Sequence, residues 1–120
     1  MTFEEVCNKL ELGNTPDWGI INSNSSRVSE FINFITANDM LDSRIKFEFV
    51  ELIVASMNDA IIDNKANCEV YASFHNYVNH ISKIKKFKPQ FQYWISIKSH
   101  DEYPVGLLIE KYLKEDSHIV

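Results

Sequence analysis

Apolar residues recur at intervals of three and four along most of this chain, which is the spacing of one face of an α-helix. The pattern is most regular after a turn at residues 64–67. There, seven apolar positions share one helical face: Val70, Tyr71, Phe74, Tyr77, Val78, Ile81 and Ile84. The spacing predicts a helix whose buried face is centred on Phe74, Tyr77, Val78 and Ile81.

The first residues of the chain predict a short helix. Thr2 and Glu5 match a capping box, in which the Thr2 hydroxyl accepts a hydrogen bond from the amide of Glu5. The apolar stripe of this helix consists of Phe3, Val6 and Leu10. The glycine and proline within residues 13–16 end it. Residues 18–21 are apolar but too few to show a period, and we interpret them as a loop anchored by Trp18.

The next part of the chain predicts two longer helices. Ser25 or Ser26 is the expected N-cap of the first, which ends at residues 38–39. Its apolar stripe consists of Val28, Phe31, Ile32 and Ile35. The second starts at Asp39, Asp42 or Ser43 and runs to about Asp63. Its expected buried stripe is Ile45, Phe49, Leu52, Ile53, Ser56 and Ala60.

Residues 89–98 fit two patterns. Alternation, typical of a strand, is shown by Phe91, Tyr93, Ile95 and Ile97. Helical spacing is shown equally well by Phe87, Phe91, Trp94, Ile95 and Lys98. A lone strand would leave its backbone groups unpaired, so we predict a helix with Pro89 in its first turn. A last helix begins near Pro104 and buries Val105, Leu108, Ile109 and Tyr112.

These segments predict an all-α fold of five or six helices, packed as a bundle or as stacked antiparallel pairs. We expect one domain over residues 1–120, because this is close to the commonest domain length. The chain is 45% hydrophobic, with eight Phe, five Tyr and two Trp to fill a core. Three glycines and three prolines are fewer than a β-sandwich or barrel usually needs for its turns.

Charge is unevenly distributed along the chain. Its net charge is −5, and eleven of its seventeen acidic residues lie within residues 1–63, against four of its twelve basic ones. This distribution argues against nucleic acid or a membrane as partner and favours a basic protein. Lysines flank Phe87, a pattern seen in single-stranded nucleic-acid binding, but we interpret this short run as a solvated helix end.

The predicted helix that ends near Asp63 carries a stripe of carboxylates. Three of them share one face with Ala55 between them, and another lies one turn earlier. Such a stripe is often only a solvated face, but the excess of acid favours an interface with Lys and Arg. The predicted partner-binding residues are Asp39, Asp42, Glu48, Glu51, Asp59 and Asp63.

The sequence predicts neither catalysis nor a metal or cofactor site. His75 and His80 are five residues apart and do not share a helix face as a metal-binding pair would. Glycines are too scattered to form a phosphate-binding loop. Cys7 and Cys68 are expected to be small buried residues in a reducing compartment rather than a disulfide. With no signal-like N-terminus and no long apolar run, we expect a cytoplasmic protein.

Three groups of residues carry a family resemblance. The first comprises Asp17-Trp18, Asn22-Ser23, Arg27-x-x-Glu30-Phe31-Ile32-x-Phe34 and Asn38-Asp39. The second is Glu51-Leu52-Ile53-x-Ala55-Ser56-x-Asn58-Asp59-Ala60. The third comprises His80-Ile81, Tyr93-Trp94 and Tyr103-Pro104-Val105-x-Leu107-Leu108. Together, over about residues 17–109, they resemble the small immunity proteins of bacterial polymorphic and contact-dependent growth inhibition toxin systems.

The resemblance implies an all-helical cytoplasmic protein that binds a cognate toxin domain, often a nuclease, and blocks it without catalysis. We expect a monomer or weak dimer. It assigns no binding residues, because the shared positions read as packing residues: Trp18, Phe31, Leu52, Ile53, Tyr93, Trp94 and Pro104. The main alternative is a helical adaptor or regulatory subunit that binds another basic protein. An enzyme that uses the acidic stripe for metal-assisted hydrolysis is a third, weaker reading. Within the immunity reading, a toxin could also dock on the segment around Trp18 or on residues 101–103.

Overall fold

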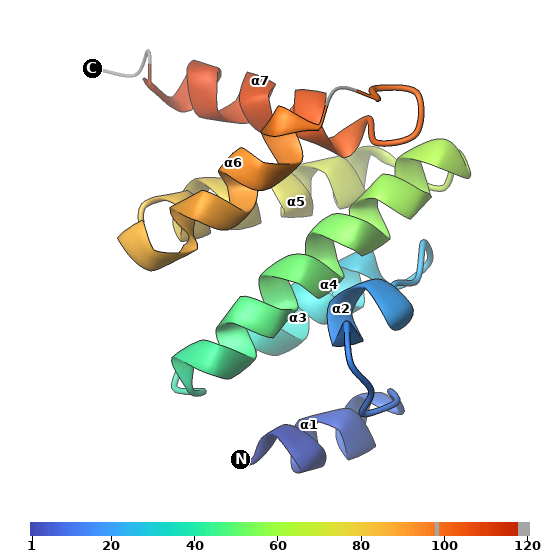
Figure 1. Ribbon diagram of the computed structural model, residues 1–120, viewed down its shortest axis with the longest axis vertical. Coiled ribbons are helices and arrows are strands. Elements are labelled where there is room, and N and C mark those ends of the chain that lie inside the picture. The colour runs from blue at the N-terminus through green and yellow to red at the C-terminus, as the bar shows by residue number, and fades with distance from the viewer. Residues whose placement is uncertain (98, 118–120) are drawn as a thin grey trace.

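The structure is a computed structural model that describes residues 1–97 and 99–117, and this part of the chain is all helical (Figure 1). Its elements are α1 (Phe3–Leu10), α2 (Trp18–Ile21), α3 (Val28–Ala37), α4 (Ser43–Ile62), α5 (Cys68–Ser82), the 3₁₀ turn η1 (Lys85–Phe87), α6 (Lys88–Ser96) and α7 (Val105–Ser117). The all-α prediction is confirmed. The predicted number of five or six helices is too low, because the described residues form seven α-helices.

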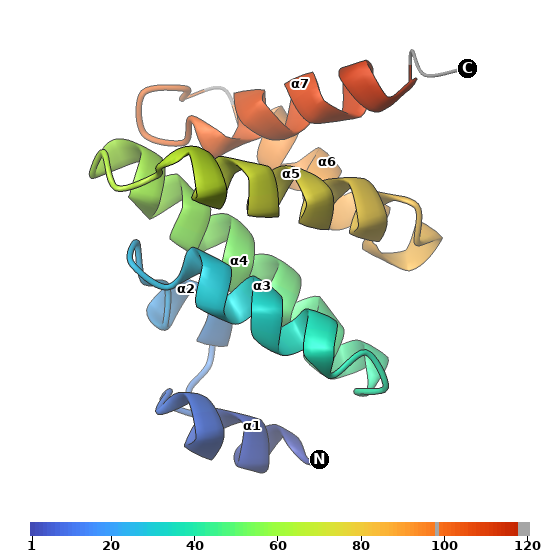
Figure 2. The ribbon, with the colours of Figure 1, turned by 180° about the vertical axis from the view of Figure 1, so that it is seen from behind.

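Helix α4 is the longest helix and crosses the middle of the molecule (Figures 1 and 2). The earlier helices α2 and α3 pack against one side of α4, and the last helix, α7, contacts its other side. Helix α5 joins the two groups by packing against both α3 and α7. The molecule measures 39 × 32 × 25 Å, with α1 at one end of the long axis and α7 at the other. The arrangement is a stack of helices around α4.

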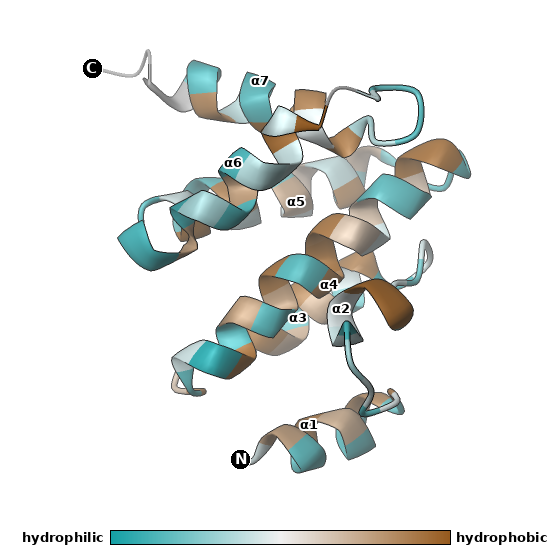
Figure 3. Cartoon of the chain, viewed as in Figure 1, coloured by the Kyte–Doolittle hydropathy of each residue, from teal (hydrophilic) through white to brown (hydrophobic). Residues whose placement is uncertain are grey.

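The core is centred on α4. All six residues of its predicted buried stripe are buried, and so is every residue from 52 to 58. Burial on all sides follows from packing between α2, α3 and α7, so the middle of α4 has no solvated face. Figure 3 shows its mainly apolar middle and more polar N-terminal end. The outward stripe assumed from the sequence is therefore interrupted at Ala55, which is buried.

Two predicted helix caps are confirmed and a third is wrong. The Thr2 hydroxyl accepts from the amide of Glu5 at 3.2 Å, and the Asp42 carboxylate accepts from the amide of Arg44 at 2.7 Å. Neither Ser25 nor Ser26 caps α3, whose N-cap residue is Arg27 without a capping side chain. Its guanidinium instead donates to Glu30 at 2.7 Å and to the carbonyl of Leu10 at 2.8 Å, which ties α1 to α3.

The predicted loop at residues 18–21 is instead the short helix α2. It starts after Asp17, whose backbone is left-handed with φ of 54°. Asn22 follows it and donates both to the carbonyl of Trp18 at 2.9 Å and to the carbonyl of Gly13 at 3.0 Å. The side chain of Asn22 therefore holds the chain before and after α2 in a fixed arrangement, which hydrophobic periodicity does not reveal.

In the C-terminal half, the ambiguous segment is helical. Helix α6 covers residues 88–96, as predicted, whereas Lys98 lies outside the described residues. The predicted buried face of α5 is confirmed, since its buried residues are Phe74, Tyr77, Val78 and Ile81. Tyr71 and Tyr93, expected to pack, are exposed, because each lies on the outer edge of its helix. Val70, Ile84, Pro104 and Leu108 are half-buried, and Val105, Ile109 and Tyr112 are buried as expected.

The two cysteines are free and differ in environment. Cys7 is buried between α1 and the rest of the core, as predicted. Cys68 is exposed, contrary to prediction, because it is the first residue of α5 and follows the N-cap Asn67. The Asn67 side chain accepts from the amide of Val70 at 3.0 Å, so this helix start faces solvent.

Candidate protein-binding face

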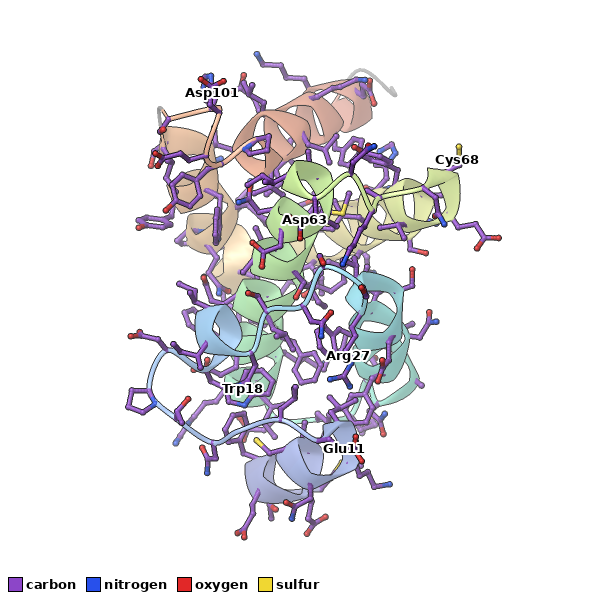
Figure 4. All side chains as sticks on the ribbon, turned by 90° about the vertical axis from the view of Figure 1, so that its right-hand side faces the viewer. Glu11, Trp18, Arg27, Asp63, Cys68 and Asp101 are labelled. Carbon is purple, nitrogen blue, oxygen red and sulfur yellow. The ribbon has the colours of Figure 1, made fainter. Side chains whose placement is uncertain are left out.

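The structure does not gather the six predicted acidic residues on one surface. Asp39 pairs with Lys46 at 3.4 Å, and Asp42 is occupied in capping α4. Asp63 lies at the opposite end of α4 from the region of Trp18 (Figure 4). Asp59 is half-buried and accepts a hydrogen bond from the hydroxyl of Ser23 at 2.8 Å. Three of the six residues therefore have separate local contacts, and a fourth, Asp63, lies apart from them at the end of α4.

The stripe is divided because α2 and the loop that follows it cross α4. A Cβ atom on Gly19 would lie 2.7 Å from the Cβ of Glu51, so only glycine allows this close approach. The Ser23 hydroxyl then reaches Asp59, two turns further along α4. Glu51 and Asp59, which share a helix face by spacing, consequently lie on opposite sides of the α2 segment.

Glu48 and Glu51 do lie together, at a pocket of about 520 Å³ between α2 and the N-terminal half of α4. A third carboxylate, Asp17, joins them there, and sequence reasoning did not select it. We call this the α2–α4 pocket. Its lining residues are Phe3, Thr15, Pro16, Asp17, Trp18, Gly19, Ile20, Arg44, Ile45, Phe47, Glu48 and Glu51. Its volume is within the range of about 300–1,000 Å³ that is usual for ligand sites.

The floor of the pocket is aromatic. Trp18 is only 3% exposed, and its ring centroid lies 5.0 Å from that of Phe3 and 5.6 Å from that of Phe49. Figure 4 shows Trp18 between α1 and α4. Its indole Nε1 is buried and has no hydrogen-bond partner among the described residues. A buried indole N–H usually has an acceptor, so Trp18 carries an unpaired donor that surrounding protein atoms cover.

The rim of the pocket carries apolar side chains in contact with solvent. Ile20 is 56% exposed and Phe47 is 44% exposed, and both line the pocket. The neighbouring Ile21 is 65% exposed, and Figure 3 shows this end of α2 as strongly hydrophobic. Exposed apolar side chains that cluster around a hollow are typical of a surface that contacts another protein.

Electrostatics at the pocket are unfavourable for its own carboxylates. Partial burial raises the pKa of Glu48, and the negative charges of Glu51 and Asp17 raise this pKa further. Arg44 is the basic residue among the described pocket-lining residues, so three carboxylates face one guanidinium group. The free pocket therefore holds excess negative charge that a cation would neutralise.

Helix α6 fixes the orientation of Glu51. The side-chain nitrogen of Gln90 donates to Glu51 Oε1 at 3.0 Å and to the carbonyl of Phe47 at 3.0 Å. Gln90 is buried, and both of these bonds are part-buried. Sequence reasoning missed Gln90, because a lone polar residue in an ambiguous apolar segment gives no local signal of a partner on α4.

A second, smaller hollow of about 330 Å³ adjoins the pocket at the start of α4. It shares Arg44, Phe47 and Glu48 with the pocket and is completed by Ser43, Lys86 and Phe87. The Lys86 ammonium donates to the Ser43 hydroxyl at 3.0 Å, which joins η1 to α4. Phe47 thus lies between two hollows, and the face formed by both is broad enough to hold more than one partner side chain.

The other features noted in the sequence form no such site. The ring of His75 stacks on that of Tyr112 at 4.0 Å. Within residues 1–97 and 99–117, no group of three or more His, Cys, Asp and Glu side chains is placed to hold a metal ion. No helix in the same part of the chain is long and apolar enough to cross a membrane. The loop that contains Asp101 is exposed, and its Glu102 carbonyl accepts from Asn58 at 3.0 Å.

No protein-family model matches this chain, and no curated protein or solved structure matches it either. Interpretation of the α2–α4 pocket therefore depends on its own geometry and chemistry.

Proposed function

We propose that this chain is an immunity protein, which binds a cognate bacterial toxin domain and neutralises it by covering the active site or a neighbouring surface. The observation that carries the proposal is the α2–α4 pocket, which three carboxylates line together with apolar side chains that are open to solvent. A surface of this kind fits a protein partner with a basic patch. The resemblance described for residues 17–109 favours the same function.

A nuclease is the favoured class of toxin. Nucleases bind phosphate through Lys and Arg, so their substrate-binding surfaces are basic. An acidic partner is attracted to such a surface and competes with the nucleic acid for it. The net charge of −5 favours this kind of association, and so do the negative charges of Glu51 and Asp17, which contribute to the raised pKa of Glu48. In this proposal the protein acts in the cytoplasm, as a monomer or weak dimer, and needs neither cofactor nor catalysis.

A test takes the protein encoded immediately upstream of this chain, whatever its sequence, as the toxin candidate. The C-terminal domain of that protein is expressed in bacteria with and without this chain, and growth and co-purification are recorded. We expect growth arrest that this chain relieves, together with a stable complex. Toxicity that continues while this chain is abundant and folded would contradict the proposal. A complex with a basic protein that has no toxic activity would instead favour the adaptor alternative.

A further inference from the structure

We infer that the α2–α4 pocket receives an arginine side chain of the protein partner, with its guanidinium between the carboxylates of Asp17, Glu48 and Glu51. The identity of that partner as a toxin rests on the proposed function, whereas the chemistry of the pocket does not. Four features of the pocket lead to arginine: its charge, its apolar walls, the fixed Glu51 and the unpaired donor of Trp18.

The net negative charge of the pocket favours a positively charged ligand. Three carboxylates line the pocket, and Arg44 supplies the opposing charge from within the described lining residues. The cause of the raised pKa of Glu48 is partial burial beside two other negative charges. A guanidinium between these groups would offset the cost of ionising Glu48, because a positive charge favours the ionised carboxylate.

The walls of the pocket suit arginine better than a small ammonium ion. Trp18, Ile20 and Phe47 line the pocket together with the carboxylates, so an entering side chain meets apolar surface beside the charged groups. Arginine has an aliphatic stem, and its planar guanidinium stacks on aromatic rings and is weakly hydrated. A simple inorganic cation would gain nothing from these walls.

One carboxylate is already held in position. Gln90 is buried and donates to Glu51 Oε1 at 3.0 Å, so the orientation of this carboxylate is set before a ligand arrives. Pre-positioned acceptors lose less side-chain freedom on binding than flexible ones. Charge-assisted hydrogen bonds from the five N–H groups of a guanidinium fit an array of fixed carboxylate oxygens.

Trp18 gives a second reason to expect a peptide rather than a lone cation. It lines the pocket, and its Nε1–H has no acceptor among the described residues. This nitrogen is covered by protein atoms, so a backbone carbonyl of the partner reaches it only when the side chains around it shift on binding. Trp94 offers a control within the same chain, since its Nε1 is also buried without a described partner but Trp94 does not line the pocket.

The experiment is a titration of the ¹⁵N-labelled protein with N-acetyl-arginine methylamide, followed by NMR. We expect millimolar concentrations to shift the indole signal of Trp18 and the amide signal of Gly19, and to leave the indole signal of Trp94 in place. The norleucine and glutamate analogues, which lack the cation, should shift neither signal. Equal shifts with norleucine would overturn the inference, because the apolar walls alone would then explain binding.

Two double variants test the carboxylates. Asp17→Asn with Glu48→Gln removes two charges, and asparagine tolerates the left-handed backbone at position 17. Glu69→Gln with Glu115→Gln removes the same charge from exposed positions on α5 and α7. We expect the first variant to lose the shifts at Trp18 and Gly19 and the second to keep them. The same response in both variants would overturn the inference.

Failure of this inference is distinguishable from failure of the proposed function. If blocked arginine leaves Trp18 unchanged while the upstream toxin is still neutralised, the arginine site is wrong and the immunity function stands. If blocked arginine binds as described and no toxin is neutralised, the arginine site stands and the immunity function is wrong.

Discussion

Glu48 shows how a single residue of the pocket can favour binding at the cost of stability. Its carboxylate is half-buried, and its neighbours Glu51 and Asp17 carry the same charge. Both effects disfavour the ionised form in the folded state, so ionised Glu48 destabilises the free protein. A carboxylate retained at such a position is typical of a functional site, where a partner supplies the missing opposite charge.

We predict that Glu48→Gln makes the free protein more stable near pH 7. The folded-state pKa of Glu48 is raised, so its penalty is present above that pKa and disappears as the pH falls below the unfolded value of about 4.3. Urea titrations near pH 7 and near pH 4 should show a gain in the free energy of unfolding that is largest at the higher pH. A less stable variant near pH 7 would contradict this prediction.

Glu30→Gln is the matched control, because it should change the free energy of unfolding in the opposite direction. The hydrogen bond from Arg27 lowers the pKa of Glu30, so ionised Glu30 stabilises the fold. This stabilisation is present above the unfolded pKa and is lost as the pH falls through the lowered one. Glu30→Gln should therefore destabilise the protein near pH 7, where Glu48→Gln stabilises it.

Asn58 connects α4 to the loop between α6 and α7. It is buried, donates to the carbonyl of Glu102 at 3.0 Å and accepts from the amide of Val105 at 3.2 Å. We predict that Asn58→Ala lowers the free energy of unfolding by about 1–3 kcal/mol, because the buried amide of Val105 and the part-buried carbonyl of Glu102 lose their partner. Urea titration measures the loss. Asn33→Ala, at an exposed position of α3, should change it by less than about 0.5 kcal/mol.

At the scale of elements, α2 determines whether the pocket exists. It is held against α4 at Gly19, where an added Cβ would meet the Glu51 backbone carbon at 2.9 Å and the Leu52 nitrogen at 2.7 Å. These are backbone atoms and cannot move aside as a flexible side chain would. The position of α2, and with it the placement of Asp17 and Ile20 on the pocket, therefore requires glycine at this point.

We predict that Gly19→Ala displaces α2, lowers the free energy of unfolding by about 1–3 kcal/mol and abolishes partner binding. The matched control is Gly13→Ala, because the nearest atom to an added Cβ there is 3.8 Å away and the backbone is not left-handed. Denaturant titration and binding measurements on both variants test the prediction. Equal behaviour of the two variants would show that close packing of α2 is unimportant.

Substitutions of two phenylalanines, one in the core and one on the binding face, should have different effects. Phe74 on α5 is fully buried, and Phe74→Ala should cost about 3–5 kcal/mol in denaturant titration. Phe47 on α4 is 44% exposed, so Phe47→Ala should cost clearly less stability while weakening partner binding. A loss below about 1 kcal/mol for Phe74→Ala would show that the buried face of α5 is wrongly assigned.

The helices with long apolar stripes could be predicted from the sequence, and α2 could not. Helical periodicity located α4 and α5 and most of their buried residues, because it reflects burial of one face. Helix α2 has four residues, which is one turn, so no period can appear. Its hydrogen bonds from Asn22 and its contact at Gly19 are tertiary features that leave no regular pattern in the sequence.

Tertiary contacts also explain why the sequence predicted only two of the three carboxylates at the pocket. Spacing alone placed Glu51 and Asp59 on one face, and the crossing of α2 separates them. Asp17 and Phe47 were not selected, since neither belongs to the carboxylate stripe. The acidic character of the N-terminal half was predicted, but the way its charges meet depends on how helices cross.

In the whole molecule, the proposed binding face lies where α1 and α2 meet the first half of α4. Helix α4 is packed from both sides, so this face has a firm base. The C-terminal helices support it from behind through Gln90 and Asn58, which reach from α6 to α4 and from α4 to the start of α7. We therefore expect partner binding to leave the backbone of the core unchanged.

The most direct test measures the affinity of the upstream toxin domain for three forms of this protein at low salt. They are the wild type, Asp17→Asn with Glu48→Gln, and Asp39→Asn with Asp63→Asn, which removes two carboxylates outside the pocket. We predict that the pocket variant binds at least about tenfold more weakly, a change of about 1.4 kcal/mol, and that the other variant binds like the wild type. Equal affinity for all three forms would contradict the assignment of the α2–α4 pocket as the binding face.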